Sequence, residues 1–257
     1  MKIVRTLKRF LPPWIMSYVS LVIGWWILSL FFPHYIVPSP PIIAGTLKDI
    51  ILYGGLMKHV TATMMRIAIG FAASMTVGIS MGVVMGARRY WESFFRDYVT
   101  VSLSIPALCW AVLATMWFGL KPASPLLATT LITFPFVALN IWEGVKAVDK
   151  ELVDMARAFE VSSKSILRKI IFPSLMPFLF AAIRYGFAIS WKIVTISEMF
   201  AATEGMGYMI VYSYETFSMR GVIAWTLLFT AIILFIEYAV FKPTEKYILR
   251  WRPEMKL

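Results

Sequence analysis

The chain has 257 residues, of which 60% are hydrophobic and 15% are charged, and its mean hydropathy is +0.75. Because soluble domains carry about 25% charged residues, this composition excludes a disordered chain and disfavours a soluble enzyme. The single cysteine, Cys109, excludes an internal disulfide framework, and the two histidines are too few for a catalytic or metal-binding cluster. We therefore expect one compact membrane domain, residues 1–257, with no catalytic residue and no metal site.

Six apolar stretches are long enough to cross a hydrocarbon core of about 30 Å. They cover approximately residues 11–32, 67–87, 98–120, 122–142, 174–200 and 221–241. The first exceeds the usual length of a signal-peptide core and lacks a small-residue cleavage site, so we interpret it as a retained helix. Pro106, Pro135 and Pro177 fall inside spans, where membrane helices tolerate kinks. We predict an all-α integral membrane fold with six transmembrane helices.

The basic residues gather in alternate connecting segments. With the amino terminus in the cytoplasm, the inner segments hold Lys2, Arg5, Lys8, Arg9, Arg88, Arg89, Arg96, Lys146, Lys150, Arg157, Lys164, Arg168, Lys169, Lys242, Lys246, Arg250, Arg252 and Lys256. The outer segments keep only Lys48, Lys58, Lys121 and Arg220. This positive-inside asymmetry accounts for most of the net charge of +11. We therefore expect the lipid bilayer, and not a nucleic acid, as the partner of these basic residues. We expect a multi-pass protein of the inner (cytoplasmic) membrane with both termini in the cytoplasm.

The second span repeats a small residue at every fourth position: Gly70, Ser74, Gly78, Gly82 and Gly86. Such a stripe allows another helix to approach closely. The neighbouring helix belongs either to the same chain, which we favour, or to a second copy.

The longest inner loop, residues 146–173, carries its own helical pattern. Four apolar residues recur at the i, i+3, i+4, i+7 spacing of a short amphipathic helix: Leu152, Met155, Ala156 and Phe159. Ser162 or Ser163 can cap a second helix, which must end or kink around Pro173. The periodicity alone fits equally a helix that docks on a partner protein and one that lies on lipid.

The residues of this loop resemble the EAA loop of ABC-importer permeases. That pattern reads E-A-A, three residues, Gly, nine residues, then I-x-L-P, and residues 154–173 keep its spacing throughout. The residues differ at four positions: Asp154, Met155, Glu160 and Phe172. A glycine adopts a left-handed turn freely, whereas Glu160 would need about 1–2 kcal/mol to do so. The turn therefore differs from that of the family, or Glu160 contacts the partner directly.

Further motifs resemble the nitrate, sulfonate and taurine branch of these permeases: Ile105-Pro106-Ala107, Trp117-Phe118-Gly119, Gly205-Met206-Gly207-Tyr208 and the run from Arg184 through Trp191-Lys192 to Glu198. The resemblance covers approximately residues 37–251. It implies a MetI-like type I importer permease with a cytoplasmic coupling helix. The docking residues it implies are Leu152, Asp154, Met155, Ala156, Phe159, Glu160, Val161 and Ser162.

The same resemblance implies the partners. Two ATP-binding cassette ATPase subunits would dock on the EAA loops of two permease copies, a homodimer, and an extracytoplasmic solute-binding protein would deliver the cargo. The chain has no G-x-x-x-x-G-K-[ST] phosphate loop, so it is not itself the ATPase. We expect no cofactor on this chain, with ATP and Mg²⁺ held by the partner subunits.

Ionisable residues inside spans are rare and mark functional sites by default. The candidate pathway residues are Arg184, Trp191, Lys192, Glu198 and Arg66. If the fifth span begins near Ser174, Arg184 lies about 15 Å deep. Arg66 can pair with Glu198, and Glu237 with Arg184 or Arg96. Such pairs either hold the helix bundle together or line the translocation pathway.

We expect the transmembrane subunit of an ATP-driven importer for a small solute, such as a nitrate-, sulfonate- or taurine-like compound. The alternative is a stand-alone secondary transporter or channel. It is disfavoured because the long inner loop carries the docking pattern and no internal repeat is visible. An intramembrane enzyme is disfavoured because no H-E-x-x-H pattern occurs.

Overall fold

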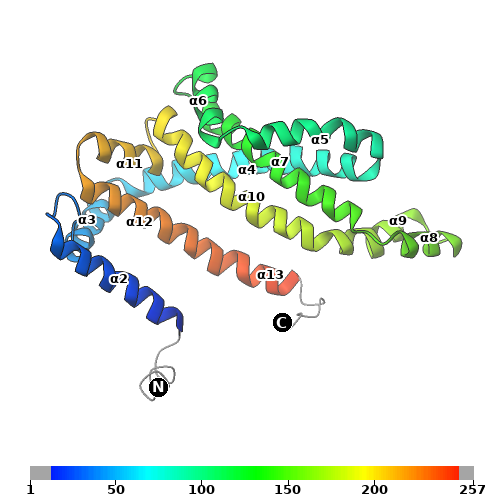
Figure 1. Ribbon diagram of the computed structural model, residues 1–257, viewed down its shortest axis with the longest axis horizontal. Helices are drawn as coiled ribbons and strands as arrows, with labels where there is room; N and C mark the ends of the chain where they lie inside the picture. The colour runs from blue at the N-terminus through cyan, green and yellow to red at the C-terminus, as the bar shows by residue number, and fades with distance from the viewer. Residues whose placement is uncertain (1–12, 249–257) are drawn as a thin grey trace, which may run out of the picture. The chain divides into compact units, whose positions relative to one another are not determined.

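The structure, a computed structural model, describes residues 13–248, and every regular element in that range is a helix (Figure 1). The all-α prediction is therefore confirmed for the described part of the chain. The basic residues predicted at the two cytoplasmic ends lie outside it: Lys2, Arg5, Lys8, Arg9, Arg250, Arg252 and Lys256. The chain divides into two compact units, Met1–Met57 with Met209–Thr230, and Lys58–Tyr208 with Ala231–Leu257.

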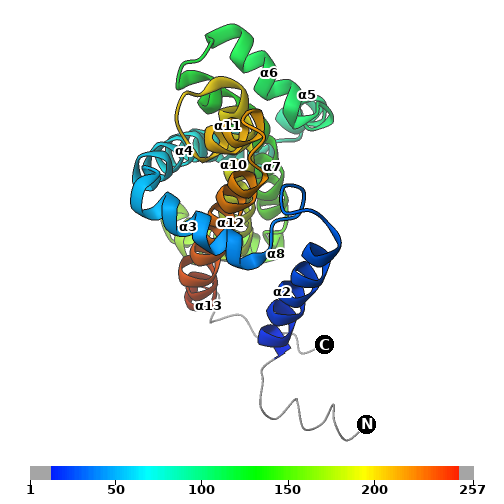
Figure 2. The same cartoon turned by 90° about the vertical axis from the view of Figure 1, so that its left-hand side faces the viewer.

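The first unit contains α2 (Pro13–Phe31) and α3 (Pro40–Tyr53), which Figure 2 shows as successive helices joined by a loop. α3 follows Ser39 and begins with two prolines, whose missing N–H groups are tolerated in the first turn of a helix. The Trp25 ring N–H donates to the Pro38 carbonyl at 3.1 Å and fastens the loop to α2. The apolar stretches did not predict α3, because it contains charged residues and is too short to be a span.

The second unit is built around α7. Its first helices are α4 (Leu56–Ala87), α5 (Arg89–Ser104), α6 (Ala107–Phe118), α7 (Ala123–Lys146), α8 (Lys150–Ala158), α9 (Ser163–Ile166), the π-helical turn η1 (Leu167–Ile171) and α10 (Phe172–Ala201). The chain continues through α11 (Met206–Glu215), α12 (Met219–Ile236), the π-helical turn η2 (Glu237–Phe241) and α13 (Lys242–Ile248). Small and branched side chains of α6, α7 and α10 form one core cluster: Ala111, Ala114, Ala128, Ile132 and Ile193.

The small residues of α4 face α7 of the same chain. A Cβ added at Gly82 would lie 2.6 Å from the Ala138 carbonyl oxygen, and one added at Gly78 would lie 2.6 Å from the Cβ of Val137. Ser74 is fully buried in the same contact, and its hydroxyl donates to the Gly70 carbonyl of α4 at 2.7 Å. The favoured interpretation of the stripe, close packing within one chain, is confirmed.

The predicted span 98–120 is wrong as a single straight helix. α5 and α6 are separate helices whose axes differ by 92°. Ile105 is extended, with φ −78° and ψ 124°, because the ring of Pro106 disfavours the helical region for the residue before it. Pro106 then precedes the first residue of α6. Here proline ends a helix instead of kinking it, whereas Pro135 and Pro177 lie inside α7 and α10 as predicted.

Four helices of the described residues are long and apolar enough to cross a membrane, or five if the bent pair α5–α6 forms one span. Their segments are Leu56–Ala87, Ala123–Lys146, Ser163–Ala201 and Met219–Ile248. The apolar part of α2, Ile15–Phe31, is shorter. The described residues therefore contain four or five candidate membrane spans, while the full set of six stays a prediction.

The second helix of the inner loop does not end around Pro173. It runs from Ser163 into α10 as one helix of 39 residues that reaches Ala201. The π-helical turn η1 shifts the hydrogen-bond register directly before α10, and Pro173 is the second residue after that shift. A π-turn absorbs one extra residue within a helix, so the helix continues past the proline.

Candidate functional site

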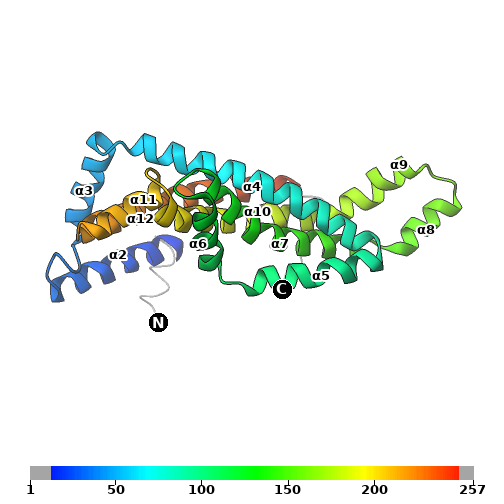
Figure 3. The same ribbon diagram turned by 90° about the horizontal axis from the view of Figure 1, so that it is seen from above.

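The inner loop forms a helical hairpin, α8 and α9, which Figures 1 and 3 show beyond the ends of α7 and α10. Asp149 starts α8: its carboxylate accepts hydrogen bonds from the backbone N–H groups of Glu151 at 2.9 Å and Leu152 at 3.4 Å. Ser162 caps α9 through the backbone N–H of Ser165 at 3.4 Å. Of the two serines proposed as caps, Ser162 is the one used. Side-chain caps of this kind fix where each short helix begins.

The turn between these helices has the geometry of a Schellman motif. The Glu160 N–H bonds to the Arg157 carbonyl at 2.9 Å, and the Val161 N–H bonds to the Ala156 carbonyl at 3.0 Å. Glu160 has a φ of +55°, in the left-handed region. Of the two alternatives, the structure does not show an altered turn: its hydrogen bonds hold Glu160 in the left-handed conformation, which a glycine would adopt at lower energy. The alternative that Glu160 contacts the partner stays a prediction.

The apolar residues predicted on α8 divide into one buried and several exposed positions. Ala156 is buried, whereas Leu152 is 45% exposed, Met155 52% and Phe159 77%. Val161, in the turn, is 40% exposed. Asp154 and Arg157 form an exposed ion pair at 3.5 Å beside them. The hairpin therefore presents an exposed apolar surface with a charged edge, in which Phe159 is the most exposed of the apolar side chains.

A cation cluster connects α5 with the end of α7, immediately before this hairpin. The Glu92 carboxylate pairs with Lys146 at 2.6 Å and with Arg96 at 2.9 Å. Both cations lie over the ring of Trp142, at 4.5 Å for Lys146 and 5.6 Å for Arg96. Cation–π contacts and the shared carboxylate therefore hold α5 against the last turn of α7. The sequence had suggested Glu237 as a partner for Arg96, and the structure gives it Glu92 instead.

A second cluster buries the predicted pair Arg66–Glu198. The Arg66 guanidinium donates to the Glu198 carboxylate at 2.7 Å, and the exposed fractions of the two side chains are 11% and 0%. Arg66 also donates to the Glu204 carbonyl at 2.7 Å. The pairing that the sequence proposed is confirmed. A carboxylate buried this deeply is stable only with several partners. The other hydrogen-bond donors around Glu198 therefore determine how stable the cluster is.

The other donors to Glu198 come from residues that were not among the predicted site residues. Thr63 donates to Glu198 at 2.9 Å and accepts from the backbone N–H of Met206 at 2.8 Å. The Gly207 N–H also donates to Glu198, at 3.0 Å. Side chains of α4 and α10 thus cap the first turn of α11. In the sequence, the Gly205-Met206-Gly207-Tyr208 motif marks the start of α11. It does not identify its partners on α4, because they are remote in sequence.

The remaining pathway candidates lie in different surroundings. Arg184 pairs with Glu237, as proposed, and also with Glu245 of α13 at 2.9 Å. Trp191 is fully buried, while Lys192, the next residue of α10, is exposed. The five candidates therefore do not form one site: two share the buried cluster, and Arg184 belongs to a separate ion-pair cluster.

The sequence contains Gly78-Ile79-Ser80-Met81-Gly82, which has the G-x-S-x-G spacing of serine hydrolases. It lies inside α4, whereas the nucleophile of those enzymes sits on a strand-to-helix turn. The Ser80 hydroxyl donates to the Thr76 carbonyl of its own helix at 2.8 Å. Ser80 is exposed on α4, and no histidine or carboxylate is bonded to its hydroxyl within the described residues. Within the described residues no group of three or more His, Cys, Asp or Glu side chains could hold a metal ion.

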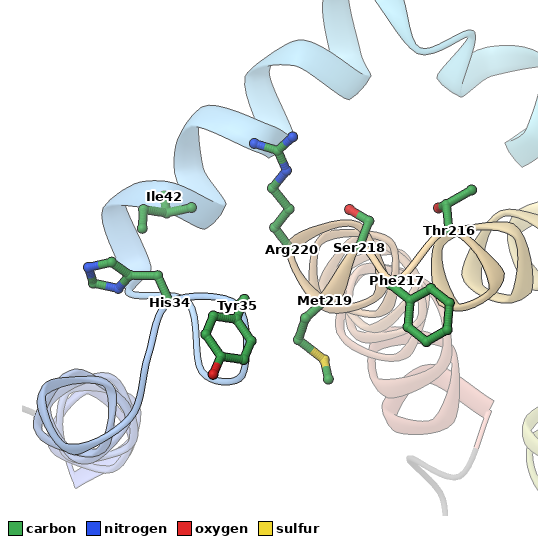
Figure 4. Close-up of a pocket in the computed structure, with 8 residues that line it drawn as sticks. All are labelled: His34, Tyr35, Ile42, Thr216, Phe217, Ser218, Met219 and Arg220. Carbon is green, nitrogen blue, oxygen red and sulfur yellow. The ribbon is translucent and has the colours of Figure 1, made fainter.

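The first unit carries a pocket of about 410 Å³. It is lined by His34, Tyr35, Ile42, Thr216, Phe217, Ser218, Met219 and Arg220. Figure 4 shows Arg220 and Ser218 on one side of the turn before α12 and Met219 on the other. Phe217 has a φ of +55° and is 95% exposed. The pocket thus combines a guanidinium, an imidazole and hydroxyls with exposed aromatic rings.

The family described as "binding-protein-dependent transport system inner membrane component" matches residues 74–241. A putative aliphatic sulfonates transport permease protein of Bacillus subtilis is 27% identical over 217 residues, which are 84% of this chain and 78% of that protein. The taurine transport system permease protein of Escherichia coli is 25% identical over 239 residues, 90% of this chain and 86% of that protein.

A solved structure described as inward facing conformations of the MetNI methionine ABC transporter is similar with a TM-score of 0.63. The match has 18% sequence identity and covers 75% of this chain and 95% of that chain. At this identity the similarity concerns the fold alone.

Proposed function

Because the chain belongs to the family of binding-protein-dependent transport system inner membrane components, it is a permease of the ABC-importer class, and we propose that it moves a small solute inward, driven by ATP that separate subunits hydrolyse. The family match over residues 74–241 carries this proposal. The exposed apolar surface of α8 is the structural observation that supports it.

We propose six crossings of the cytoplasmic membrane with both termini inside. The six would be α2, the bent pair α5–α6, and the segments built on α4, α7, α10 and α12. The positive-inside distribution supports this orientation, since Arg88, Arg89, Lys146 and Lys150 would all face the cytoplasm. The α8–α9 hairpin is then cytoplasmic, and the 39-residue helix from Ser163 to Ala201 is long enough to extend beyond the membrane.

The α8–α9 hairpin would be the coupling segment on which the ATPase docks. Phe159 would insert into an apolar groove of the ATPase, flanked by Leu152 and Met155, because exposed aromatic side chains are common anchors of protein interfaces. Asp154 and Glu160 would lie at the rim, where charge chiefly tunes recognition. The cluster of Glu92, Lys146 and Trp142 would pass movement of the hairpin to α5.

The proposed assembly contains two copies of this chain, two ATPase subunits that bind ATP and Mg²⁺, and an external solute-binding protein. Each chain carries one α8 segment, so two chains would match a pair of ATPases. In the proposed orientation the pocket beside Arg220 faces outward, where the solute-binding protein would dock. The relatives named for sulfonate and taurine transport support a small organic anion of that kind as cargo.

For the translocation pathway, we propose Lys192 as the candidate that reaches the cargo. Its side chain is exposed on α10, whereas Arg66 and Glu198 satisfy each other within the protein. An ammonium group would favour an anionic cargo. Arg184, held by Glu237 and Glu245, would then stabilise the bundle through paired charges.

Replacing Phe159 with alanine tests this function. We expect Phe159→Ala to weaken ATPase binding by about 2 kcal/mol or more, because the anchor of the interface is lost. The variant should still insert and fold, since the side chain is 77% exposed. Detergent pull-down of the ATPase and substrate-stimulated ATP hydrolysis would be measured together. Val240→Ala, an exposed apolar residue of η2 outside the hairpin, serves as the matched control.

Normal binding and normal coupling with Phe159→Ala would contradict the docking assignment. Transport by the purified chain alone, without ATP, would instead support the stand-alone transporter or channel. The two outcomes separate an error in the docking surface from an error in the class of function.

A further inference from the structure

A groove of about 490 Å³ runs between α4 and α5, and neither the docking surface nor the buried ion-pair cluster uses it. Its walls are formed by Val77, Met81 and Val84 of α4 with Trp91 and Phe95 of α5. Figure 3 shows the two helices converging at the connection between them and separating away from it. All of these residues belong to the second compact unit.

The groove offers mainly hydrocarbon surface from the side chains of its walls. Its two hydroxyl groups belong to Thr76 and Ser80. Thr76 donates to the Ala72 carbonyl at 2.9 Å, and Ser80 donates to the Thr76 carbonyl at 2.8 Å. Because both donors are satisfied within α4, a polar cargo would lose its hydration there without replacement. A hydrocarbon chain fits the same walls without that penalty.

Two arginines lie at the connection between α4 and α5, next to the lining residues Val84 and Trp91. Arg88 follows Val84 by four positions and directly precedes the first residue of α5, and Arg89 is that first residue. Both side chains are exposed. Among the residues that the structure describes, neither guanidinium forms a salt bridge with a carboxylate. A guanidinium donates two parallel hydrogen bonds, a geometry that matches a phosphate group.

We propose that this groove binds an anionic glycerophospholipid, with one acyl chain between α4 and α5 and the phosphate on Arg88 and Arg89. Charge complementarity selects this occupant: the connection between α4 and α5 carries two arginines that form no salt bridge within the described residues, and the groove beside them is apolar. Trp91 lies between the two regions, at the place where tryptophan commonly marks the membrane interface. The proposal requires that α4 and α5 lie in the bilayer, but it does not depend on ATPase docking or on the cargo.

Lipid retention by the purified full-length chain tests the headgroup site. Native mass spectrometry would compare bound dioleoyl phosphatidylglycerol with bound dioleoyl phosphatidylcholine. We expect wild type to prefer the anionic lipid and each arginine-to-glutamine change, Arg88→Gln or Arg89→Gln, to lower that preference about fivefold. Arg168→Gln, an exposed inner arginine remote in the chain, should leave the preference unchanged. Equal retention of both lipids by wild type would overturn the proposal.

The acyl chain is tested separately. Phosphatidylglycerol brominated in its acyl chains should quench tryptophan fluorescence, and Trp91→Phe should remove part of that quenching. Val84→Phe, which fills the groove, should lower retention of dioleoyl phosphatidylglycerol, whereas soluble glycerol phosphate should compete weakly. Because Val84→Phe can disturb folding, the Trp91 measurement stands independently.

Disulfide crosslinking between two chains through Val84→Cys, in a Cys109→Ser background with the lipid present, would assign the groove to a second copy and overturn the lipid proposal.

Discussion

A glutamate in the left-handed region of the backbone closes the turn after α8, at the position where the importer loop has glycine. The Glu160 and Val161 amides complete the turn by hydrogen bonds to the last carbonyls of α8. The exposed apolar surface of α8 thus keeps its shape although the residue at the turn is strained. Local hydrogen bonding, and not the intrinsic preference of the residue, determines the conformation here.

Glu160→Gly should stabilise this turn by about 1 kcal/mol, because the left-handed penalty of a side chain disappears. We expect the Val161 amide to exchange its hydrogen about fivefold more slowly, measured by hydrogen–deuterium exchange. ATPase binding should be kept. Glu160→Ala retains the penalty and should give no gain. Faster exchange at Val161 in the glycine variant would show that Glu160 supports the turn in another way.

The buried carboxylate of Glu198 gives the second prediction at this scale. Arg66→Met leaves that carboxylate without its cation, which typically costs about 3–5 kcal/mol of folding free energy. The double variant Arg66→Met, Glu198→Gln should recover much of the loss, because a neutral amide still accepts from Gly207 and Thr63. Unfolding in detergent would measure both. A single variant as stable as wild type would mean that the pair does not stabilise the bundle.

At the scale of helices, the contact between α4 and α7 depends on the absence of side chains. Small residues every fourth position bring the two backbones together, and Gly78 and Gly82 leave no room for a Cβ atom. α7 also packs against α6 and α10, so α4 is held by the most buried helix of its unit. Movement of α7 would therefore be passed directly to α4.

Gly82→Ala should destabilise the folded chain by about 1–3 kcal/mol, because the added methyl group collides with the Ala138 carbonyl and Ile141. Gly45→Ala in α3 is the matched control, since a Cβ there meets nothing within 4 Å. The control should be neutral or stabilising by up to about 1 kcal/mol. The melting temperatures of the two purified variants provide the comparison. Equal melting temperatures would contradict the close approach of α4 and α7.

For the whole molecule, the proposed docking of one ATPase on each α8–α9 hairpin implies an assembly in pairs. A single α8 segment presents one Phe159, which in the proposed assembly is the anchor for one ATPase. The stripe on α4, which could have formed a contact between copies, is occupied by α7 of the same chain. Any interface between two permeases must therefore use other surfaces.

We expect the purified importer to contain two copies of this chain and two ATPase subunits. Mass photometry or native mass spectrometry would give this ratio directly. Phe159→Ala should shift the distribution toward permease without ATPase, while permease pairs remain. A complex with one permease for two ATPases would refute the pairing.

Hydropathy and charge alone determined that the chain crosses a membrane several times, because long uncharged stretches have few stable alternatives in a bilayer. The EAA-like spacing located the α8–α9 hairpin, and Ser162 as a cap is a local feature of the sequence. The Arg66–Glu198 pair was also foreseeable, since both charges would be costly within a membrane without a partner. These features depend on the composition of single segments or on strong pairwise forces.

Tertiary structure alone decided how proline acts at each site and which donors surround Glu198. Pro106 ends a helix and Pro173 is passed by a π-turn, although the same residue type occurs at both. Thr63 and the backbone of Gly207 meet Glu198 only when α4, α10 and α11 are assembled. The hydrogen bonds of a turn likewise hold Glu160 in a conformation that its side chain disfavours. Sequence patterns identify which groups need partners, but the packing of remote segments determines which partners they find.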